Sequence, residues 1–301
     1  MFNTTISFLL IQFYYSEALC IFIFSLLLLS YLTTLAGNIL IIFATSKHQS
    51  LHTPMYFFLS NLSIVEICVT TTITPKLMSI VLFGNRVISY WGCSLQCYFY
   101  FALASIDFFL LAVMSFDRYV AVCLPLHYVT VMNYRLCLYL AAGSWLLGFM
   151  DTLPPTIFTY NVHFCGSEIE HFFCDIEPIL KLVCEDTSLI NLLSLIASSF
   201  TVLGSLACIT VSYTLIIFAI FKIRSGGQRC KTFSTCSSHL MLVVIFYSGS
   251  LFMCLRFING SSFDINKMAV VLNTIITPML NPFIYTLRNS QVQHAIRVTF
   301  A

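Results

Sequence analysis

The stretch from Met114 to Cys123 reads MSFDRYVAVC and closes a long apolar segment that begins near Cys93. It places Asp117 and Arg118 where burial in hydrocarbon would cost roughly 2.5–3.5 kcal/mol for each charge. At helical spacing Arg118 shares one face with Asp107, and the other members of that face are Cys97, Tyr100, Ala104, Leu111 and Met114. We therefore expect this face to look into a helix bundle, although an Arg118 side chain that snorkels to the membrane surface would also accommodate its charge.

The composition is that of a membrane protein. Hydrophobic residues make up 59% of the 301 residues, charged residues make up 9%, and the mean hydropathy is +0.92. A soluble domain carries about 25% charged residues, so this chain must be solvated by lipid. We predict seven membrane-spanning segments near residues 19–45, 55–81, 93–123, 137–158, 189–221, 232–256 and 267–287. The Pro154-Pro155 pair is expected to end the fourth of them.

The distribution of Lys and Arg predicts an extracellular N-terminus, because cations gather on the cytoplasmic side of membrane proteins. In this orientation nine of them are cytoplasmic: Lys47, Arg118, Arg135, Lys222, Arg224, Arg229, Lys231, Arg288 and Arg297. Five are outside: Lys76, Arg86, Lys181, Arg256 and Lys267. We divide the chain into an extracellular N-terminus (1–18), a membrane domain (19–288) and a short cytoplasmic tail (289–301). Asn3 begins a glycosylation sequon in the extracellular part.

The predicted extracellular loop over 159–188 contains three cysteines, and a fourth stands at the outer end of the third segment. These are Cys165, Cys174, Cys184 and Cys93. Four cysteines in an oxidising compartment can form two disulfides in three ways. A metal site that uses His163, Cys165, His171 and Cys174 is the alternative, but its spacing matches no common zinc pattern.

Five runs along the chain resemble the olfactory (odorant) receptor family of rhodopsin-like (class A) G-protein-coupled receptors. They are LHTPMYFFLSNLS (51–63), DRYVAVCLPLHY (117–128), HFFCD (171–175), KTFSTCSSHL (231–240) and PMLNP (278–282). The chain departs from the family at Ser115-Phe116 and at Thr232, where Ala-Tyr and Ala are usual. The resemblance implies an all-α membrane protein: a seven-transmembrane helix bundle with a short amphipathic helix after the seventh span.

The resemblance also implies a function. A small volatile odorant would bind in the outer half of the bundle, and an olfactory stimulatory-type heterotrimeric G protein would then raise cyclic AMP at the plasma membrane. The candidate ligand-binding residues are Tyr100, Phe101, Ala104, Ser105, Phe173, Ile176, Ser198, Thr201, Val202, Tyr247, Ser250, Leu251, Cys254, Val271 and Thr274. This apolar set with a few hydroxyls suits a small, mostly uncharged ligand. An amine is disfavoured because no acid lies between Cys93 and Ile106.

Three further groups of residues follow from the resemblance. The disulfides would be Cys93–Cys174 and Cys165–Cys184. Activation and G-protein coupling would use Asp117, Arg118, Tyr119, Tyr213, His239, Pro282 and Tyr285. An ion or proton site would use Asn38, Glu66, Asp107 and Asn281. Two carboxylates close together at low dielectric cannot both remain bare, which favours a sodium ion or a shared proton. A neutral hydrogen-bond network is the alternative.

Other function classes find less support in the sequence. It contains no His-Glu-x-x-His, Gly-x-Ser-x-Gly or phosphate-loop motif, so we expect neither an enzyme nor a bound cofactor beyond the possible sodium ion. We expect membrane lipids, and no nucleic acid, among its partners. A transporter or channel is the rival class, because acids inside a membrane often mark ion paths. It predicts inverted repeats or broken helix pairs, which the sequence does not show.

Overall fold

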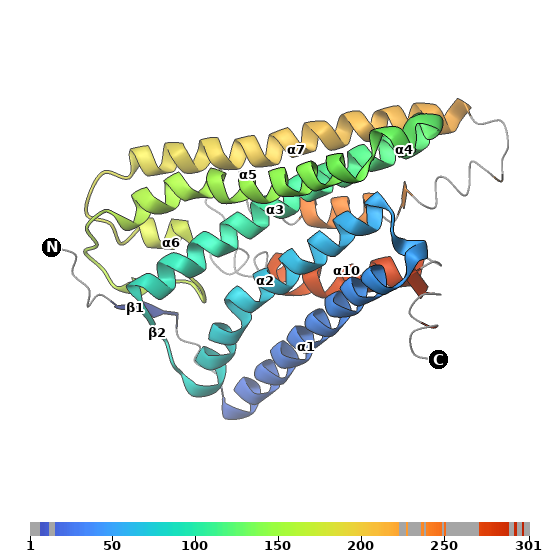
Figure 1. The fold of residues 1–301 in the computed structure, drawn as a ribbon. Coiled ribbons are helices and arrows are strands. Elements are labelled where there is room, and N and C mark those ends of the chain that lie inside the picture. Colours follow the sequence, from blue (N-terminus) through green and yellow to red (C-terminus); the bar gives the residue numbers. More distant parts are fainter. Residues whose placement is uncertain are drawn as a thin grey trace.

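The computed structural model describes residues 7–11, 16–222, 227, 236–237, 239–248, 250, 271–288, 292–293 and 297 (Figure 1). Within these residues five helices are long and apolar enough to cross a membrane. They are α1 (Glu17–Lys47), α2 (Pro54–Phe83), α3 (Tyr90–Cys123), α5 (Tyr134–Tyr160) and α7 (Ser188–Lys222). Each contains one of the first five predicted segments, and each helix is two to five residues longer than the segment predicted for it. A mostly helical membrane fold is therefore confirmed.

Two shorter helical stretches fall in the sixth and seventh predicted segments. The first is the apolar helix His239–Ser248. The second is a π-helical turn, η3 (Leu272–Ile276), which leads into α10 (Thr277–Arg288). Parts of both segments lie outside the described ranges. Nearly all of the amphipathic helix predicted after the seventh span lies outside them too.

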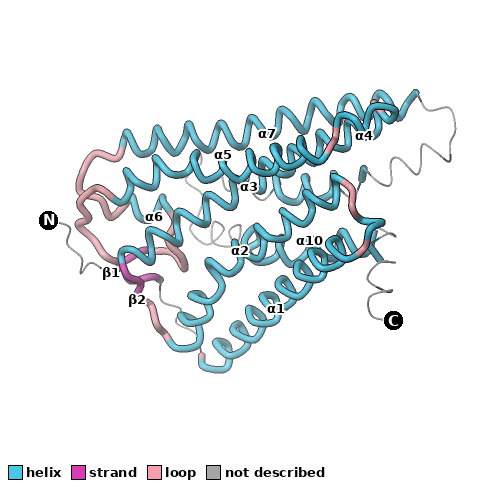
Figure 2. The backbone as a smooth tube through the Cα atoms, viewed as in Figure 1, coloured by secondary structure: helices cyan, strands magenta, loops and turns pink. Residues whose placement is uncertain are grey.

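Helix α3 is the centre of the bundle. It packs against α2, α5 and α7, while α1 packs against α2 and α10 (Figure 2). Gly148 lets α5 approach α3 closely, because a Cβ at this position would lie 2.4 Å from Ile106 Cγ1 and 2.9 Å from the Ala102 carbonyl oxygen. Small residues permit such close contacts between membrane helices, where dispersion replaces the hydrophobic effect.

Local sequence determines where several helices begin and end. Ser16, Ser89 and Asn133 cap α1, α3 and α5, and each side chain accepts a hydrogen bond from a backbone N–H of the first turn. Helix α2 begins at Pro54, whose missing N–H costs nothing in a first turn. It ends at Gly84, where φ is +63°, a left-handed conformation that favours glycine.

The expectation that Pro154-Pro155 ends the fourth segment was wrong, because α5 continues to Tyr160. Threonine hydroxyls accompany the prolines along this part of the helix. Thr152 donates to the Gly148 carbonyl at 3.0 Å, and Thr159 donates to the Pro155 carbonyl at 2.7 Å. Such side-chain bonds, together with packing by neighbouring helices, are what lets membrane helices tolerate proline.

The all-α expectation was also incomplete, because a three-stranded sheet lies at one end of the bundle, opposite α4 (Tyr128–Val131) (Figure 1). Its central strand β1 (Ser7–Leu10) pairs antiparallel with β2 (Val87–Ser89) and parallel with β3 (Glu168–Ile169). Phe8 and Leu10 of β1 are fully buried beneath it. The remaining short elements are η1 (Gln49–Leu51), η2 (Pro125–His127) and α6 (Ile176–Leu180).

Candidate functional site

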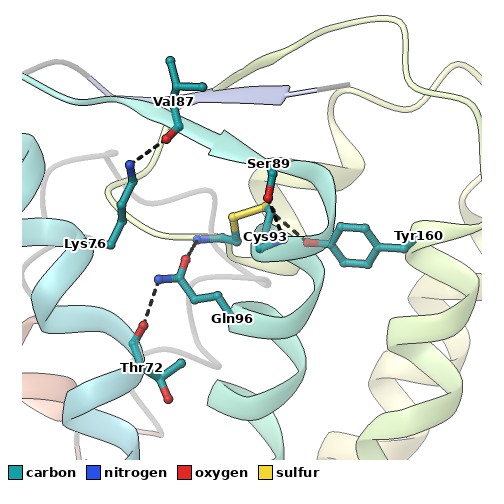
Figure 3. The surroundings of a disulfide bond; sticks show 9 residues. Thr72, Lys76, Val87, Ser89, Cys93, Gln96 and Tyr160 are labelled. Carbon is teal, nitrogen blue, oxygen red and sulfur yellow. Dashed lines mark hydrogen bonds between the residues drawn. A yellow bond between two sulfur atoms is a disulfide. The ribbon is translucent and has the colours of Figure 1, made fainter. Parts of the chain in front are cut away.

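The loop between α5 and α7 is fastened to α3 by a disulfide. Cys93 and Cys174 are bonded, with Cα atoms 5.4 Å apart. Figure 3 shows Gln96 beside this bridge: its Oε1 accepts from the Cys174 backbone N–H at 3.1 Å, and its Nε2 donates to the Thr72 carbonyl at 3.0 Å. One glutamine thus joins the loop, α3 and α2, and holds the loop over the end of the bundle.

The second predicted disulfide, Cys165–Cys184, is present too, with Cα atoms 5.6 Å apart. It closes the loop on itself, and the Cys165 N–H donates to the Leu182 carbonyl at 2.8 Å. Because both Cys165 and Cys174 are in disulfides, neither has a thiolate for the alternative metal site. His163 forms an exposed pair with Glu185 instead.

The fastened loop brings aromatic side chains onto α3. Phe173 is fully buried, and its ring meets that of Tyr100 edge-on, with centroids 4.9 Å apart. Tyr100 also packs against Phe101 at 5.1 Å. Ser105 is buried one turn further along, whereas Ala104 and Ile176 are half-buried. These candidate pocket residues therefore lie along the inner side of α3 and under the loop.

A chain of hydrogen bonds joins α5, α7 and the helix His239–Ser248. Tyr247 Oη donates to Ser205 Oγ at 2.6 Å, and Ser205 in turn donates to the Thr201 carbonyl oxygen. Thr201 Oγ1 donates to Asp151 Oδ2 of α5 at 2.6 Å. The sequence pointed to Tyr247 and Thr201 but missed Ser205 and Asp151. Asp151 carries a sequence signal, because it is an acid within an otherwise apolar segment.

The prediction for Ser198 was wrong. Its side chain is exposed on the outside of α7 and bonds the Leu195 carbonyl of its own helix at 3.2 Å. The inward face of α7 includes Thr201 and, at helical spacing before it, Ala197, Ser194 and Ile190. None of these residues is exposed. The Ser194 hydroxyl is buried and has no hydrogen-bond partner among the described residues.

The remaining pocket predictions divide into two groups. Ser250 and Thr274 are buried, and Val202 and Val271 are half-buried, so none of these four faces away from the bundle. Leu251 and Cys254 lie outside the described residues, as does the glycosylation candidate Asn3.

Three of the four predicted ion-site residues line one small cavity of about 10 Å³, which is on the order of a single water molecule. These are Glu66, Asp107 and Asn281, and Asn281 Nδ2 donates to Glu66 Oε1. Asn38 does not line the cavity; its amide donates to the Thr34 carbonyl at 3.0 Å and the Pro278 carbonyl at 3.5 Å. The other lining residues are Leu62, Leu111, Leu242 and Phe246.

Several oxygens around this cavity are unsatisfied. Glu66 Oε2, Asp107 Oδ1 and Asn281 Oδ1 are buried, and none has a hydrogen-bond partner in the described part of the chain. Buried polar atoms without partners are uncommon in proteins, and an ion is one explanation for them. Carboxylate and amide oxygens are also the donors that a hard cation prefers. The residues present therefore fit a small cation.

Near the C-terminal end of α3, the Asp117 side chain is fully buried and accepts hydrogen bonds from two side chains. Arg118 Nη2 donates to Asp117 Oδ2 at 2.5 Å, and Tyr128 Oη donates to Asp117 Oδ1 at 2.8 Å. Only 13% of the Arg118 side chain is exposed, so it pairs with Asp117 rather than extending into solvent. Burial, followed by the neighbouring Asp117 carboxylate, raises the pKa of Tyr128. Sequence reasoning assigned no role to Tyr128.

The other predicted switch residues belong to α3, α7, α10 and the helix His239–Ser248. Tyr213 of α7 and His239 stack almost in parallel, at an interplanar angle of 5°, and Tyr213 Oη lies 2.7 Å from His239 Nδ1. Pro282 is buried within α10, and Tyr119 is half-buried on α3. Tyr285 belongs to α10, but its side chain is outside the described set.

Comparison with known proteins identifies the relatives of this chain. The family model described as "Olfactory receptor" matches residues 27–301. The chain is 46% identical over 279 residues to olfactory receptor 6E1 of Mus musculus, covering 92% of this chain and 89% of the relative. It is 45% identical over 292 residues to olfactory receptor 6T1 of Homo sapiens, covering 97% and 90%. It is 47% identical over 293 residues to olfactory receptor 287 of Rattus norvegicus, covering 97% and 94%. The chain therefore belongs to the olfactory receptor family.

Proposed function

We propose that this chain is a plasma-membrane odorant receptor that binds a small, mostly apolar ligand and activates a stimulatory olfactory-type G protein, which raises cyclic AMP. The observation that carries the proposal is the placement of functional groups along α3. This one helix carries the aromatic wall at Tyr100, the buried acid Asp107 and the Asp117–Arg118 pair. A helix that contacts α2, α5 and α7 is suited to couple a ligand at one end to a partner at the other.

The proposed topology has seven spans, with an extracellular N-terminus and a cytoplasmic C-terminus. Its support is the nine-to-five distribution of Lys and Arg and the two disulfides at the opposite end from α4, since disulfides persist in oxidising compartments. In this orientation Asp117, Arg118 and Tyr128 face the cytoplasm. Membrane lipids would meet the apolar outer faces and the cytoplasmic cations.

At the cytoplasmic end the proposal assigns Arg118 the role of a latch. Asp117 engages the guanidinium and is itself held by Tyr128, so Arg118 is occupied within its own chain. Tyr213, His239 and Pro282 lie on the helices that would have to move for a G-protein segment to enter. Ligand binding would favour the arrangement in which Arg118 is released, because a ligand shifts an equilibrium by its differential affinity for the two states.

In the middle of the bundle we propose a sodium ion or a shared proton held by Glu66 and Asp107, with Asn281 as a third oxygen donor. Its charge would offset two carboxylates that line the same small cavity. Purified receptor should melt at a higher temperature in sodium chloride than in choline chloride. Glu66→Gln and Asp107→Asn should abolish that difference. An equal melting temperature of the wild type in both salts would exclude the sodium ion and leave a shared proton or the neutral hydrogen-bond network.

The signalling proposal is tested with a cyclic-AMP reporter in cells that express the full chain and are exposed to a panel of volatile compounds. At least one compound should raise cyclic AMP in the wild type. Arg118→Ala at matched surface level should give no response, because it removes the guanidinium that the G protein would meet. A surface-expressed wild type that raises no cyclic AMP with any volatile compound would refute this part of the proposal.

A further inference from the structure

We infer that the ligand of this receptor is a neutral hydrogen-bond donor, such as an alcohol or a phenol, rather than a ketone, ester or ether. The inference rests on the proposed function and adds a chemical class to it. It is drawn from the hydroxyl chain that runs from Tyr247 through Ser205 and Thr201 to Asp151.

Ser205 determines the direction of the hydrogen bond that Tyr247 makes to it. A serine hydroxyl has one proton, and Ser205 gives it to the Thr201 carbonyl, with a second contact of 3.1 Å to the Val202 carbonyl. Carbonyl oxygens only accept, so Ser205 must be the donor in both contacts. Tyr247 must therefore donate its own proton to Ser205 Oγ, at 2.6 Å. The phenol oxygen of Tyr247 keeps only lone pairs for any further contact.

Asp151 has the same effect on Thr201. The hydroxyl proton of Thr201 is directed to Asp151 Oδ2, which accepts it at 2.6 Å. Thr201 is 2% exposed and Asp151 is half-buried between α5 and α7. Water therefore has little access to the hydrogen bond between Thr201 and Asp151. Two neighbouring hydroxyls of the candidate pocket, those of Tyr247 and Thr201, can thus accept a proton from a ligand and cannot donate one.

The position of the Tyr247 ring is fixed by an aromatic neighbour. Phe108 of α3 meets it edge-on at 5.1 Å between centroids. The phenol therefore keeps its place between α3 and α7. Ser194, whose hydroxyl has no partner within the described residues, lies seven positions before Thr201, or roughly 10 Å along the helix axis. Its hydroxyl is an alternative polar contact on the inward face of α7, so it needs its own control.

The acceptor wall formed by Tyr247 and Thr201 has a measurable consequence. An alcohol can donate a hydrogen bond to these oxygens. A ketone or a methyl ether of the same skeleton has no proton to donate, so its oxygen would face the lone pairs of Tyr247 and Thr201 and remain without a hydrogen bond. One hydrogen bond in such a site corresponds to about tenfold in affinity. Asp151 acts here as a positioning residue, because it sets the direction of the Thr201 proton without itself belonging to the candidate pocket.

The probes are two matched sets: 2-octanol, 2-octanone and 2-methoxyoctane, and cyclohexanol, cyclohexanone and methoxycyclohexane. Full-length receptor in lipid nanodiscs is titrated with each compound, and binding is read from the rise in its thermal unfolding midpoint. Cyclic AMP is recorded in parallel. We expect each alcohol that binds to do so about tenfold more tightly than its ketone and its ether.

Four variants locate the preference. Tyr247→Phe and Thr201→Val each remove one acceptor and should reduce the alcohol preference. Asp151→Leu removes the oxygen that takes the Thr201 proton, so Thr201 can donate to a ligand and the alcohol-to-ketone ratio should fall. A purely structural role for Asp151 would weaken all three compounds of a set equally. Ser198→Ala removes an exposed hydroxyl from the same helix and should leave the ratio unchanged.

The outcomes separate this inference from the proposed function. Ketones or ethers that bind as tightly as their alcohols, or a panel in which no alcohol binds the folded receptor, overturn the inference. So does a ratio that changes in Ser194→Ala but not in Tyr247→Phe or Thr201→Val. A clear alcohol preference in binding without any rise in cyclic AMP supports the inference and counts against the proposed signalling.

Discussion

Replacing Phe8 by alanine should release the β1 strand from the end of the bundle that carries the two disulfides. Phe8 is fully buried, stacks on Tyr90 at 6.3 Å between centroids and meets Phe164 edge-on at 5.2 Å. Substituting a buried phenylalanine by alanine costs about 3–5 kcal/mol. Because β1 is the central strand, losing its anchor also weakens its hydrogen bonds to the two neighbouring strands.

Those hydrogen bonds make the effect measurable. The N–H of Leu9 donates to the Ser167 carbonyl at 2.8 Å, and the N–H of Leu10 donates to the Arg86 carbonyl at 3.1 Å. Their exchange with deuterium requires the strand to open. Each 1.4 kcal/mol is a factor of ten, so a loss of about 3 kcal/mol should speed exchange by about two orders of magnitude. Hydrogen–deuterium exchange of receptor in nanodiscs, read by mass spectrometry over residues 7–11, gives this rate.

The matched control is Ser7→Ala, because Ser7 lies on the same strand but is exposed. It should leave the exchange rate of the Leu9 and Leu10 amides close to that of the wild type. If Phe8→Ala changes exchange by less than about threefold, or if Ser7→Ala changes it equally, the strand is not held by its buried ring and the reasoning is wrong.

Three other substitutions test separate parts of the fold. Gly148→Ala should lower the melting temperature and the surface level, because the new methyl group meets backbone atoms of α3 at 2.9 and 3.0 Å; Gly143→Ala, whose Cβ meets nothing within 4 Å, should be neutral or stabilising by up to about 1 kcal/mol. Opening Cys165–Cys184 by a double serine substitution should cost about 3 kcal/mol for a 19-residue separation, and an unchanged thermal midpoint would contradict this. Tyr128→Phe should raise ligand-free cyclic AMP at equal surface level, because Asp117 loses one of its partners; an unaltered basal signal would exclude the latch.

The five long helices could be predicted because a helix that spans hydrocarbon needs about 20 mostly apolar residues in a row. Such a run is visible in the sequence even when the helices that pack against it are unknown. The sheet could not. Its strands have four, three and two residues and come from segments about 80 positions apart, too short to show the alternation by which a strand is recognised. Only the pairing of Leu9 with Val87 and Glu168 in space reveals them.

The candidate site was predictable to a similar extent. The polar face of α3 followed from spacing, because Asp107 and Arg118 cannot face lipid without a cost; Asp107 is buried and only 13% of the Arg118 side chain is exposed. On α7 the face was assigned incorrectly at Ser198, because Ser198, Ser199 and Thr201 are all polar but differ in burial, so polarity does not single out the inward face. Asp151 was conspicuous in the sequence, but its partner Thr201 lies 50 residues away and no local pattern joins the two.

Hydropathy and burial run in opposite directions when α1 is compared with α3. In the most apolar 18-residue window of α1, 6% of residues are buried, whereas the corresponding window of α3 is less apolar and 67% buried. Lipid tails are as apolar as leucine, so no hydrophobic force draws α1 inward, while every polar group gains from leaving the lipid. Polar side chains therefore mark the interior, and there each must find a partner or receive one from outside. Asp117 and Thr201 have found theirs, whereas oxygens of Glu66 and Asp107 and the acceptor face of Tyr247 remain available. These are the groups at which an ion or a ligand can add a contact that the described part of the chain does not supply.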